Sequence, residues 1–176
     1  MMCVTFSSCT SVGMAAQVVA NTVLNLLFFM MKGTTAMQAR VKWVEQAMFL
    51  AESGSGHTVV MDGPEANGGR NLGVRPMEML LMGLGGCSTF DVVSILKKSR
   101  QDVRDCEVRI EAERAEEEPK VFTKIALHFI VSGNALKENV VKRAVDLSAE
   151  KYCSASIMLG RAGVEMTHSF EIVEAV

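Results

Sequence analysis

Two cysteines carry the most reactive side chains in this sequence. Cys87 lies in the run GGCSTFDVV and Cys153 in the run KYCSAS. A thiolate is a strong nucleophile, and a second thiol nearby can trap the sulfenic acid that forms when the first is oxidised. If the two segments meet in the fold, the pair forms a redox site. If they do not, both are small apolar core residues, as free cysteines commonly are. The pattern alone leaves both interpretations open.

Cys87 is expected on a long helix over Pro76–Arg100. A proline is favourable in the first turn of a helix, and the basic residues at the other end suit the C-terminus of the helix dipole. The residues between these ends are apolar on nearly all sides, which is typical of a helix buried at the centre of a domain or along a subunit interface. Gly85 and Gly86 each cost about 1 kcal/mol relative to alanine, which indicates close backbone approach or a kink.

Cys153 is expected on a second helix, over Lys137–Leu159, followed by glycines that end it. Residues on one stripe of this helix recur at every fourth position: Val141, Val145, Ala149 and Cys153. The charged side chains fall mostly off this stripe, so the pattern predicts an amphipathic helix.

The remaining elements are expected to be strands, because apolar and polar residues alternate along them. Three short strands precede the first helix, a long hairpin follows it, and one strand ends the chain: Ala39–Val44, Ala47–Ala51, His57–Asp62, Cys106–Glu113, Val121–Val131 and Val164–Val173. The expected inward faces of the last two are Val121, Thr123, Ile125, Leu127, Phe129 and Val131, and Met166, His168, Phe170 and Ile172. The order βββ–α–ββ–α–β predicts an α+β fold with a mostly antiparallel sheet.

Composition limits the classes of function. The chain has 176 residues, of which 49% are hydrophobic and 22% charged, so one globular domain with a core is expected. A net charge of −2 gives no reason to expect nucleic-acid binding. Five cysteines without a CxxC pair indicate reduced thiols and a cytoplasmic protein. The three histidines are separated and lack the spacing of a metal site.

Residues 1–36 differ from the rest of the chain. Val12–Met31 is apolar, but no Lys or Arg precedes it, so the basic region of a signal peptide is missing. We interpret residues 1–36 as an extension outside the fold and residues 37–176 as the globular domain. A signal or anchor with cleavage after Ala36 is the alternative, and a membrane-tethered protein would follow from it.

The two cysteine motifs and the order of elements resemble the OsmC/Ohr family of osmotically inducible and organic-hydroperoxide-resistance proteins. The similarity covers about residues 37–176. It implies an intertwined homodimer with active sites at the subunit interface, and no metal or organic cofactor. It also implies that Cys87 attacks an organic hydroperoxide and becomes a sulfenic acid. Cys153 would then resolve this acid as a disulfide, which a dithiol donor reduces.

The sequence departs from the family at several positions. Active members carry a glutamate ten residues before the first cysteine, whereas here that position is Met77 and the carboxylate is Glu78. On a straight helix, Glu78 lies about 180° from Cys87, so it reaches the thiol only if the glycines distort the helix or a partner chain presents it. The alternative is that Glu78 only stabilises the helix N-terminus. The family proline after the second cysteine is Ser154 here.

The family also pairs its reactive cysteine with an arginine that lowers the thiol pKa. Arg70, inside the loop before the first helix, is our choice for this role over Arg75. Asp91 follows Cys87 by one helical turn, where a carboxylate would raise the thiol pKa.

The leading hypothesis is therefore a thiol-dependent hydroperoxide reductase with site residues Cys87, Cys153, Glu78 and Arg70. The departures favour a rival of a different class. In it the same dimer binds an apolar small molecule, and its cysteines pack without turning over.

Overall fold

The computed structural model describes residues 37–175, so the interpretation of residues 1–36 lies outside the described chain. The described residues form two compact units, 37–40 with 52–57 and 41–51 with 58–175. The helices and strands follow in the order β1 (Ala39–Glu45), β2 (Met48–Ser53), β3 (Thr58–Met61), η1 (Glu65–Asn67), α2 (Pro76–Lys98), β4 (Asp102–Arg114), β5 (Phe122–Asn134), α3 (Glu138–Leu147), η2 (Ser148–Tyr152), α4 (Ser154–Arg161) and β6 (Glu165–Glu174). The expected α+β fold is confirmed.

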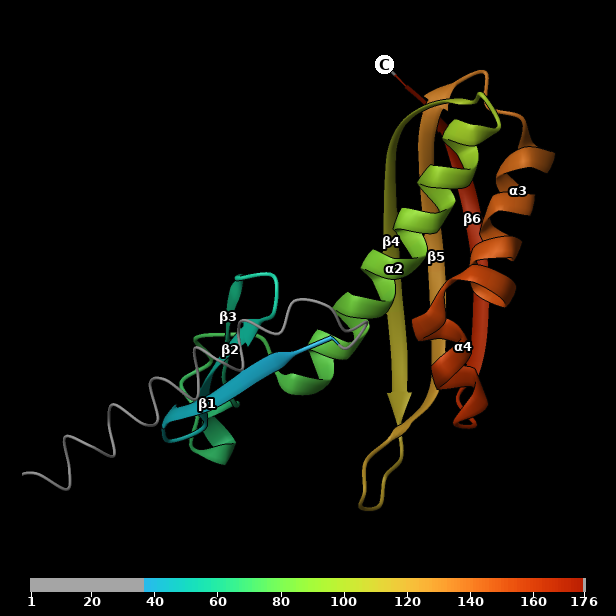
Figure 1. Ribbon diagram of the computed structural model, residues 1–176. Coiled ribbons are helices and arrows are strands. Elements are labelled where there is room, and N and C mark those ends of the chain that lie inside the picture. The colour runs from blue at the N-terminus through green and yellow to red at the C-terminus, as the bar shows by residue number, and fades with distance from the viewer. Residues whose placement is uncertain (1–36, 176) are drawn as a thin grey trace, which may run out of the picture. The chain divides into compact units, whose positions relative to one another are not determined.

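The strands form two three-stranded sheets, β1-β2-β3 and β4-β5-β6. β4 and β5 pair antiparallel, which confirms the long hairpin. β6 pairs with β5 in parallel, because the chain crosses back through α3 and α4 before it enters β6. The helices α2, α3 and α4 lie on one face of this second sheet (Figure 1).

The core lies between that sheet face and the helices. Its buried apolar residues come from α2, β5 and α3: Leu84, Val92, Leu96, Phe122, Ile125, Leu127, Phe129, Val131, Val141, Ala144 and Val145. The alternation that the sequence shows along β6 is also present in the structure, with Met166, His168, Phe170 and Ile172 on the more buried face.

The start of β5 differs from the expected pattern. Val121 and Thr123 are exposed, and Phe122 between them is buried. The register explains the difference, because Glu113 pairs with Lys124 and Arg114 with Phe122, so Thr123 has no partner. Because of this irregularity, the residues before Thr123 point to the opposite faces from those that the alternation after Thr123 predicts.

The helix that carries Cys87 begins and ends close to the expected positions. α2 starts at Pro76, and Glu78 Oε2 accepts a hydrogen bond of 2.9 Å from the backbone N–H of Arg75. This bond satisfies one of the N–H groups that the first turn leaves unpaired. The glycines do not interrupt the helix. A Cβ at Gly85 would lie 2.9 Å from Cδ1 of Ile110 on β4, so the expected close approach is confirmed at that glycine.

A smaller part of the α2 surface is buried than the sequence pattern predicts. Within the described chain, the buried residues Leu84, Gly85, Ser88, Val92 and Leu96 form one stripe. Large apolar side chains elsewhere on the helix stay exposed, and Phe90 is 72% exposed. One sheet and two neighbouring helices can cover only part of a helix that is apolar all round. By length and composition α2 could also cross a membrane, with a mean hydropathy of 1.7. Core helices often share this property.

The expected single helix over Lys137–Leu159 is wrong. The structure has α3, then one π-helical turn, η2, and then a separate helix, α4. Cys153 stands between them in an extended conformation, with φ −67° and ψ 101°. Its sulfur accepts a hydrogen bond from the N–H of Ser156, so Cys153 acts as the N-cap of α4.

β1 is exposed along its whole length in the described chain. The sequence predicts one apolar and one wet face for this strand, yet Val41 and Trp43 are uncovered as well, with Trp43 62% exposed. Apolar side chains on both β1 and α2 are therefore left without a covering layer in the single chain.

Candidate functional site

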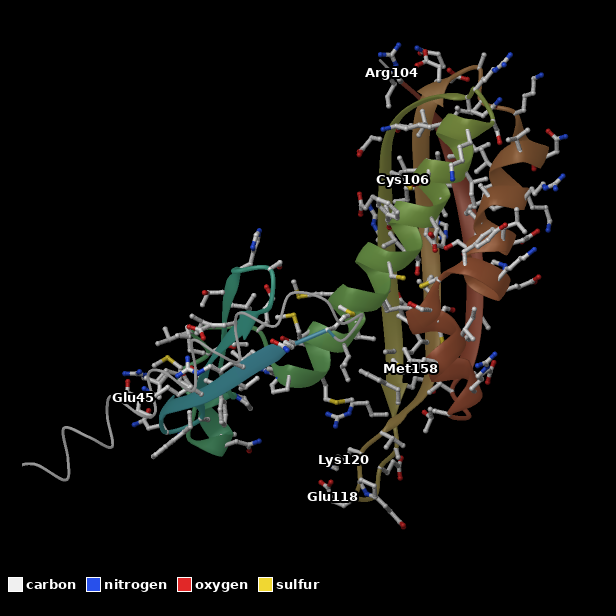
Figure 2. The ribbon with its side chains drawn as sticks, viewed as in Figure 1. Glu45, Arg104, Cys106, Glu118, Lys120 and Met158 are labelled. Carbon is white, nitrogen blue, oxygen red and sulfur yellow. The ribbon has the colours of Figure 1, made fainter. Side chains whose placement is uncertain are left out.

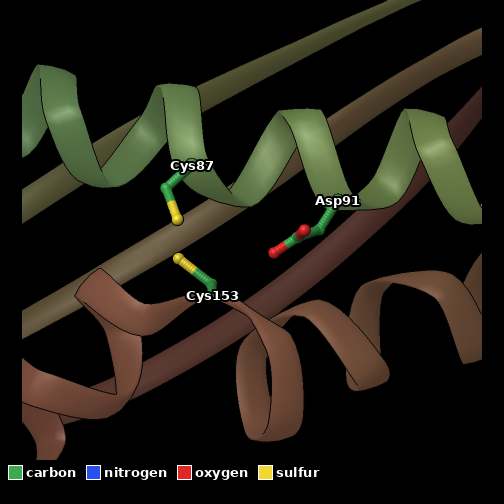
Figure 3. Close-up of side chains that lie close together, drawn as sticks. All are labelled: Cys87, Asp91 and Cys153. Atoms are coloured by element: carbon green, nitrogen blue, oxygen red, sulfur yellow. The ribbon is translucent and has the colours of Figure 1, made fainter. Parts of the chain in front are cut away.

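Cys87 and Cys153 lie close together in the structure. Cys87 projects from α2, Cys153 projects from the extended residue before α4, and their sulfur atoms point toward each other (Figure 3). The two sulfur atoms lie within 4.8 Å of each other, and neither cysteine is in a disulfide. The geometry thus favours a paired thiol site over two unrelated core residues.

A buried hydroxyl group, that of Ser88, lies beside Cys153, and a second one supports the backbone of Ser88. Ser88 Oγ lies 3.3 Å from Cys153 Sγ and also donates a hydrogen bond of 2.8 Å to the carbonyl oxygen of Leu84. Ser148 Oγ donates to the carbonyl oxygen of Ser88 over 3.0 Å. A serine hydroxyl has one proton that rotates to suit its partners. Ser88 can therefore turn its proton toward Cys153 when that thiol ionises.

The surroundings lower the pKa of the Cys87 thiol below its ordinary value. Desolvation raises this pKa, but hydrogen bonds from Cys153, the backbone N–H of Ala155 and the hydroxyl of Ser154 together outweigh it. Ala155 lies in the first turn of α4, where N–H groups and the helix dipole stabilise a negative charge. Cys87 is therefore the thiol that ionises more readily.

Cys153 is shifted in the opposite direction. Desolvation of this fully buried side chain raises its pKa, and hydrogen bonds from Ser88 and Ser156 offset only part of that effect. The charge of an ionised Cys87 raises it further. The pair is therefore asymmetric, because the pKa of Cys87 is lowered and that of Cys153 is raised.

Asp91 is the third reactive group beside the pair. It lies one turn along α2 from Cys87, and its carboxylate points toward the two sulfur atoms (Figure 3). Its Oδ2 atom is buried and has no hydrogen-bond partner within the described chain. Desolvation raises the pKa of Asp91, and its charge raises the pKa of Cys87, in the direction that the sequence predicts.

Glu78 and Arg70 do not join the thiols within the described chain. The Glu78 carboxylate caps the start of α2, which is the alternative weighed for it from the sequence. Arg70 forms an ion pair with Glu45, and its backbone N–H donates to the buried carboxylate of Asp62. Within the described chain, hydrogen bonds and the start of α4 lower the Cys87 pKa without an arginine.

Three residues of this site could not be predicted from the sequence patterns: Ser88, Ser148 and Ser156. One signal for the helix that begins after Cys153 was present. The family that the sequence resembles has a proline where this chain has Ser154, and proline favours the first position of a helix, so the resemblance indicated a helix start there.

The other candidates lie elsewhere. Cys106 projects from β4 (Figure 2), and desolvation raises its pKa to about 11, as befits a core thiol. His168 Nε2 lies 3.2 Å from Asp146 Oδ1, so this histidine is hydrogen-bonded, as the sequence predicts for a core position.

A pocket of about 620 Å³ borders Asp91. Two basic residues, Lys98 and Arg143, line this pocket. Much of the remaining lining is apolar or aromatic: Phe90, Ile95, Val140, Leu147 and Tyr152. Its volume falls in the range of small-molecule sites, so an apolar ligand has room beside Asp91.

Replacing Asp91 by asparagine is expected to lower the Cys87 pKa further, because the substitution removes a negative charge that opposes the thiolate. The rate of Cys87 alkylation by iodoacetamide, followed against pH by peptide mass spectrometry, measures this pKa. The Asp91→Asn profile should move to lower pH. Asp105→Asn is the matched control, because Asp105 acts on Cys106 and should leave the Cys87 profile unchanged. An unchanged profile in Asp91→Asn would contradict the placement of this carboxylate.

Comparisons with known proteins agree with this fold. Residues 68–169 match the family model described as OsmC-like protein. The protein YhfA of Escherichia coli K12 is 61% identical over 139 residues, which are 79% of this chain and 100% of YhfA. A crystal structure of a hypothetical protein from Aquifex aeolicus VF5 has a TM-score of 0.70 and 29% identity, covering 81% of this chain and all of that one. An organic hydroperoxide resistance protein OsmC from Legionella pneumophila has a TM-score of 0.59 at 17% identity, covering 80% and 99%, and shares the fold.

Proposed function

The chain belongs to the OsmC-like protein family, and on that premise we propose that residues 37–176 form a thiol peroxidase that reduces organic hydroperoxides. The observation that carries the proposal is the Cys87/Cys153 pair. Its sulfur atoms lie within 4.8 Å of each other, and the pKa values of the two thiols shift in opposite directions. A thiol with a lowered pKa beside a second thiol is the arrangement that such a cycle needs.

The reaction proceeds in three steps. The Cys87 thiolate attacks the terminal oxygen of the hydroperoxide; the O–O bond breaks, Cys87 becomes a sulfenic acid, and the alkoxide takes a proton to leave as an alcohol. The Cys153 sulfur then attacks the sulfenic sulfur, so a disulfide forms and water leaves. A dithiol donor reduces the disulfide and restores both thiols. We place this cycle in the cytoplasm, where thiols are kept reduced.

The proposal includes a homodimer. The uncovered apolar side chains of β1 and α2 are the surfaces that a second copy would bury. In that dimer Glu78 and Arg70 would be presented to the thiols of the partner. The ion pair that holds Arg70 is half-exposed and therefore weak enough to be exchanged. Light scattering during size-exclusion chromatography tests the dimer, and a monomer mass at micromolar concentration would overturn this part.

The decisive experiment uses one equivalent of oxidant. The reduced full chain is mixed with cumene hydroperoxide or hydrogen peroxide, quenched within seconds, and its thiols are mapped by peptide mass spectrometry. We expect a Cys87–Cys153 disulfide that forms faster with cumene hydroperoxide. If both thiols stay free in a folded protein, the peroxidase proposal fails.

Ser88→Ala is expected to slow disulfide closure and leave formation of the sulfenic acid unchanged. Loss of this hydroxyl raises the pKa of Cys153 further, so less of the resolving thiolate is available. Rapid quenching with dimedone, which traps sulfenic acids, should show a longer-lived intermediate. Ser148→Ala is the matched control, because it also removes a buried hydroxyl but one bonded to a backbone carbonyl. Equal effects of the two variants would assign the change to packing.

The second candidate is a non-enzymatic dimer that binds an apolar small molecule. The pocket beside Asp91 favours it, because the lining is largely apolar and carries two basic residues, Lys98 and Arg143. The same oxidation experiment separates the two functions. Thiols that stay free, combined with saturable binding of a fluorescent fatty acid, would support the binding protein.

A further inference from the structure

The cluster beside α4 contains three metal-binding side chains. Cys87 Sγ, Cys153 Sγ and one carboxylate oxygen of Asp91 all lie within 4.8 Å of one another. Cys87 and Asp91 come from successive turns of α2, and Cys153 faces them from the residue before α4 (Figure 3). Two thiolates and a carboxylate are ligands that Zn²⁺ accepts.

Asp91 gives an independent reason to place a cation here. Its Oδ2 atom is buried, and within residues 37–175 it has no hydrogen-bond partner. The ion pairs of the described chain do not include Asp91, although Lys98 and Arg143 line the same pocket. Asp91 as a whole is half-buried, but a buried oxygen atom without a hydrogen-bond partner is costly, and coordination of a metal removes that cost.

The spacing is close to that of a tetrahedral site. Zn–S bonds of 2.3 Å and Zn–O bonds near 2.1 Å would place the ligand atoms about 3.6–3.8 Å apart. The three atoms already lie within 4.8 Å, so inward shifts of about 1 Å or less bring them to that geometry. Three protein ligands leave the fourth position open to water or another small ligand.

We propose that Cys87, Cys153 and Asp91 form a binding site for Zn²⁺. Binding releases the thiol protons to solvent and forms two Zn–S bonds. Each sulfur atom donates to the metal the electron pair with which it would otherwise react. The metal-bound protein therefore has masked thiols, and removal of the metal restores them. Metal binding in this form does not depend on whether the protein turns over a hydroperoxide.

The test uses the reduced, chelator-treated full chain without a histidine tag. It is titrated with Co²⁺, whose visible spectrum reports tetrahedral coordination and thiolate ligands, and bound Co²⁺ is then displaced with Zn²⁺. We expect one equivalent per chain and protection of Cys87 from alkylation. Cys87→Ser and Cys153→Ser should lose the thiolate bands, and Asp91→Asn should weaken binding by roughly ten- to hundred-fold, comparable with the loss of supporting groups at known sites.

Cys106→Ser is the control, because Cys106 lies outside the cluster, and it should bind as the unaltered chain does. Absence of the tetrahedral spectrum in the unaltered, folded protein would overturn the proposal. Unchanged affinity in Asp91→Asn, which keeps both thiols, would overturn the three-ligand site. The titration contains no hydroperoxide. A protein that does not bind metal is therefore distinguished from one that does not reduce hydroperoxides.

Discussion

Replacing Cys87 by serine is expected to abolish consumption of cumene hydroperoxide by the protein in the presence of a dithiol. Cys87 is the thiol whose pKa the site lowers, and a serine hydroxyl in its place stays protonated and is a weak nucleophile. Loss of a covalent nucleophile should reduce turnover by at least about a thousand-fold. The rate of hydroperoxide loss, measured with excess dithiol, checks this expectation.

Cys153→Ser should behave differently from Cys87→Ser. Cys87 can still be oxidised once, so dimedone should trap a sulfenic acid, but no intramolecular disulfide can follow. Cys106→Ser is the matched control because Cys106 is a core thiol on β4 away from the cluster, and it should turn over normally. Full turnover in Cys87→Ser, or an equal loss in Cys106→Ser, would contradict the assigned roles.

Phe129→Ala is expected to lower the free energy of unfolding by about 3–5 kcal/mol, the usual cost of removing a large aromatic side chain from a core. Phe129 is 1% exposed, at the middle of β5 in the sheet that supports α2 and α3. This loss is large because whole domains are stable by only about 5–15 kcal/mol. Urea denaturation, followed by circular dichroism at equal protein concentrations, measures the change.

His128→Ala is the control for this prediction. His128 neighbours Phe129 on the same strand but faces outward, where it bonds to Ser169. Its replacement should change the free energy of unfolding by only about 0.5 kcal/mol, as is usual for surface positions. Similar losses in both variants would show that the alternating faces of β5 are wrongly assigned.

Several features could be predicted from the sequence because they depend on local geometry. Side chains alternate across a strand, so the faces of β6 and most of β5 follow from the order of apolar and polar residues. The limits of α2 follow from Pro76 and the basic residues at its end. The cysteine motifs, with the order of elements, also identified the family that the comparisons show.

The tertiary structure alone decided how the site works. The pattern of every fourth residue predicts one helix through Cys153, but a π-helical turn and a new N-cap break it there. This break places the backbone N–H of Ala155, in the first turn of α4, beside Cys87, where it helps to lower the pKa of that thiol. The proximity of Cys87, Cys153 and Asp91 could not be predicted from the sequence either. Sequence periodicity reports which face a residue shares with its neighbours along one element. It carries no information on which residues of another element will face them across the core, and that pairing sets the charges and hydrogen bonds of this site.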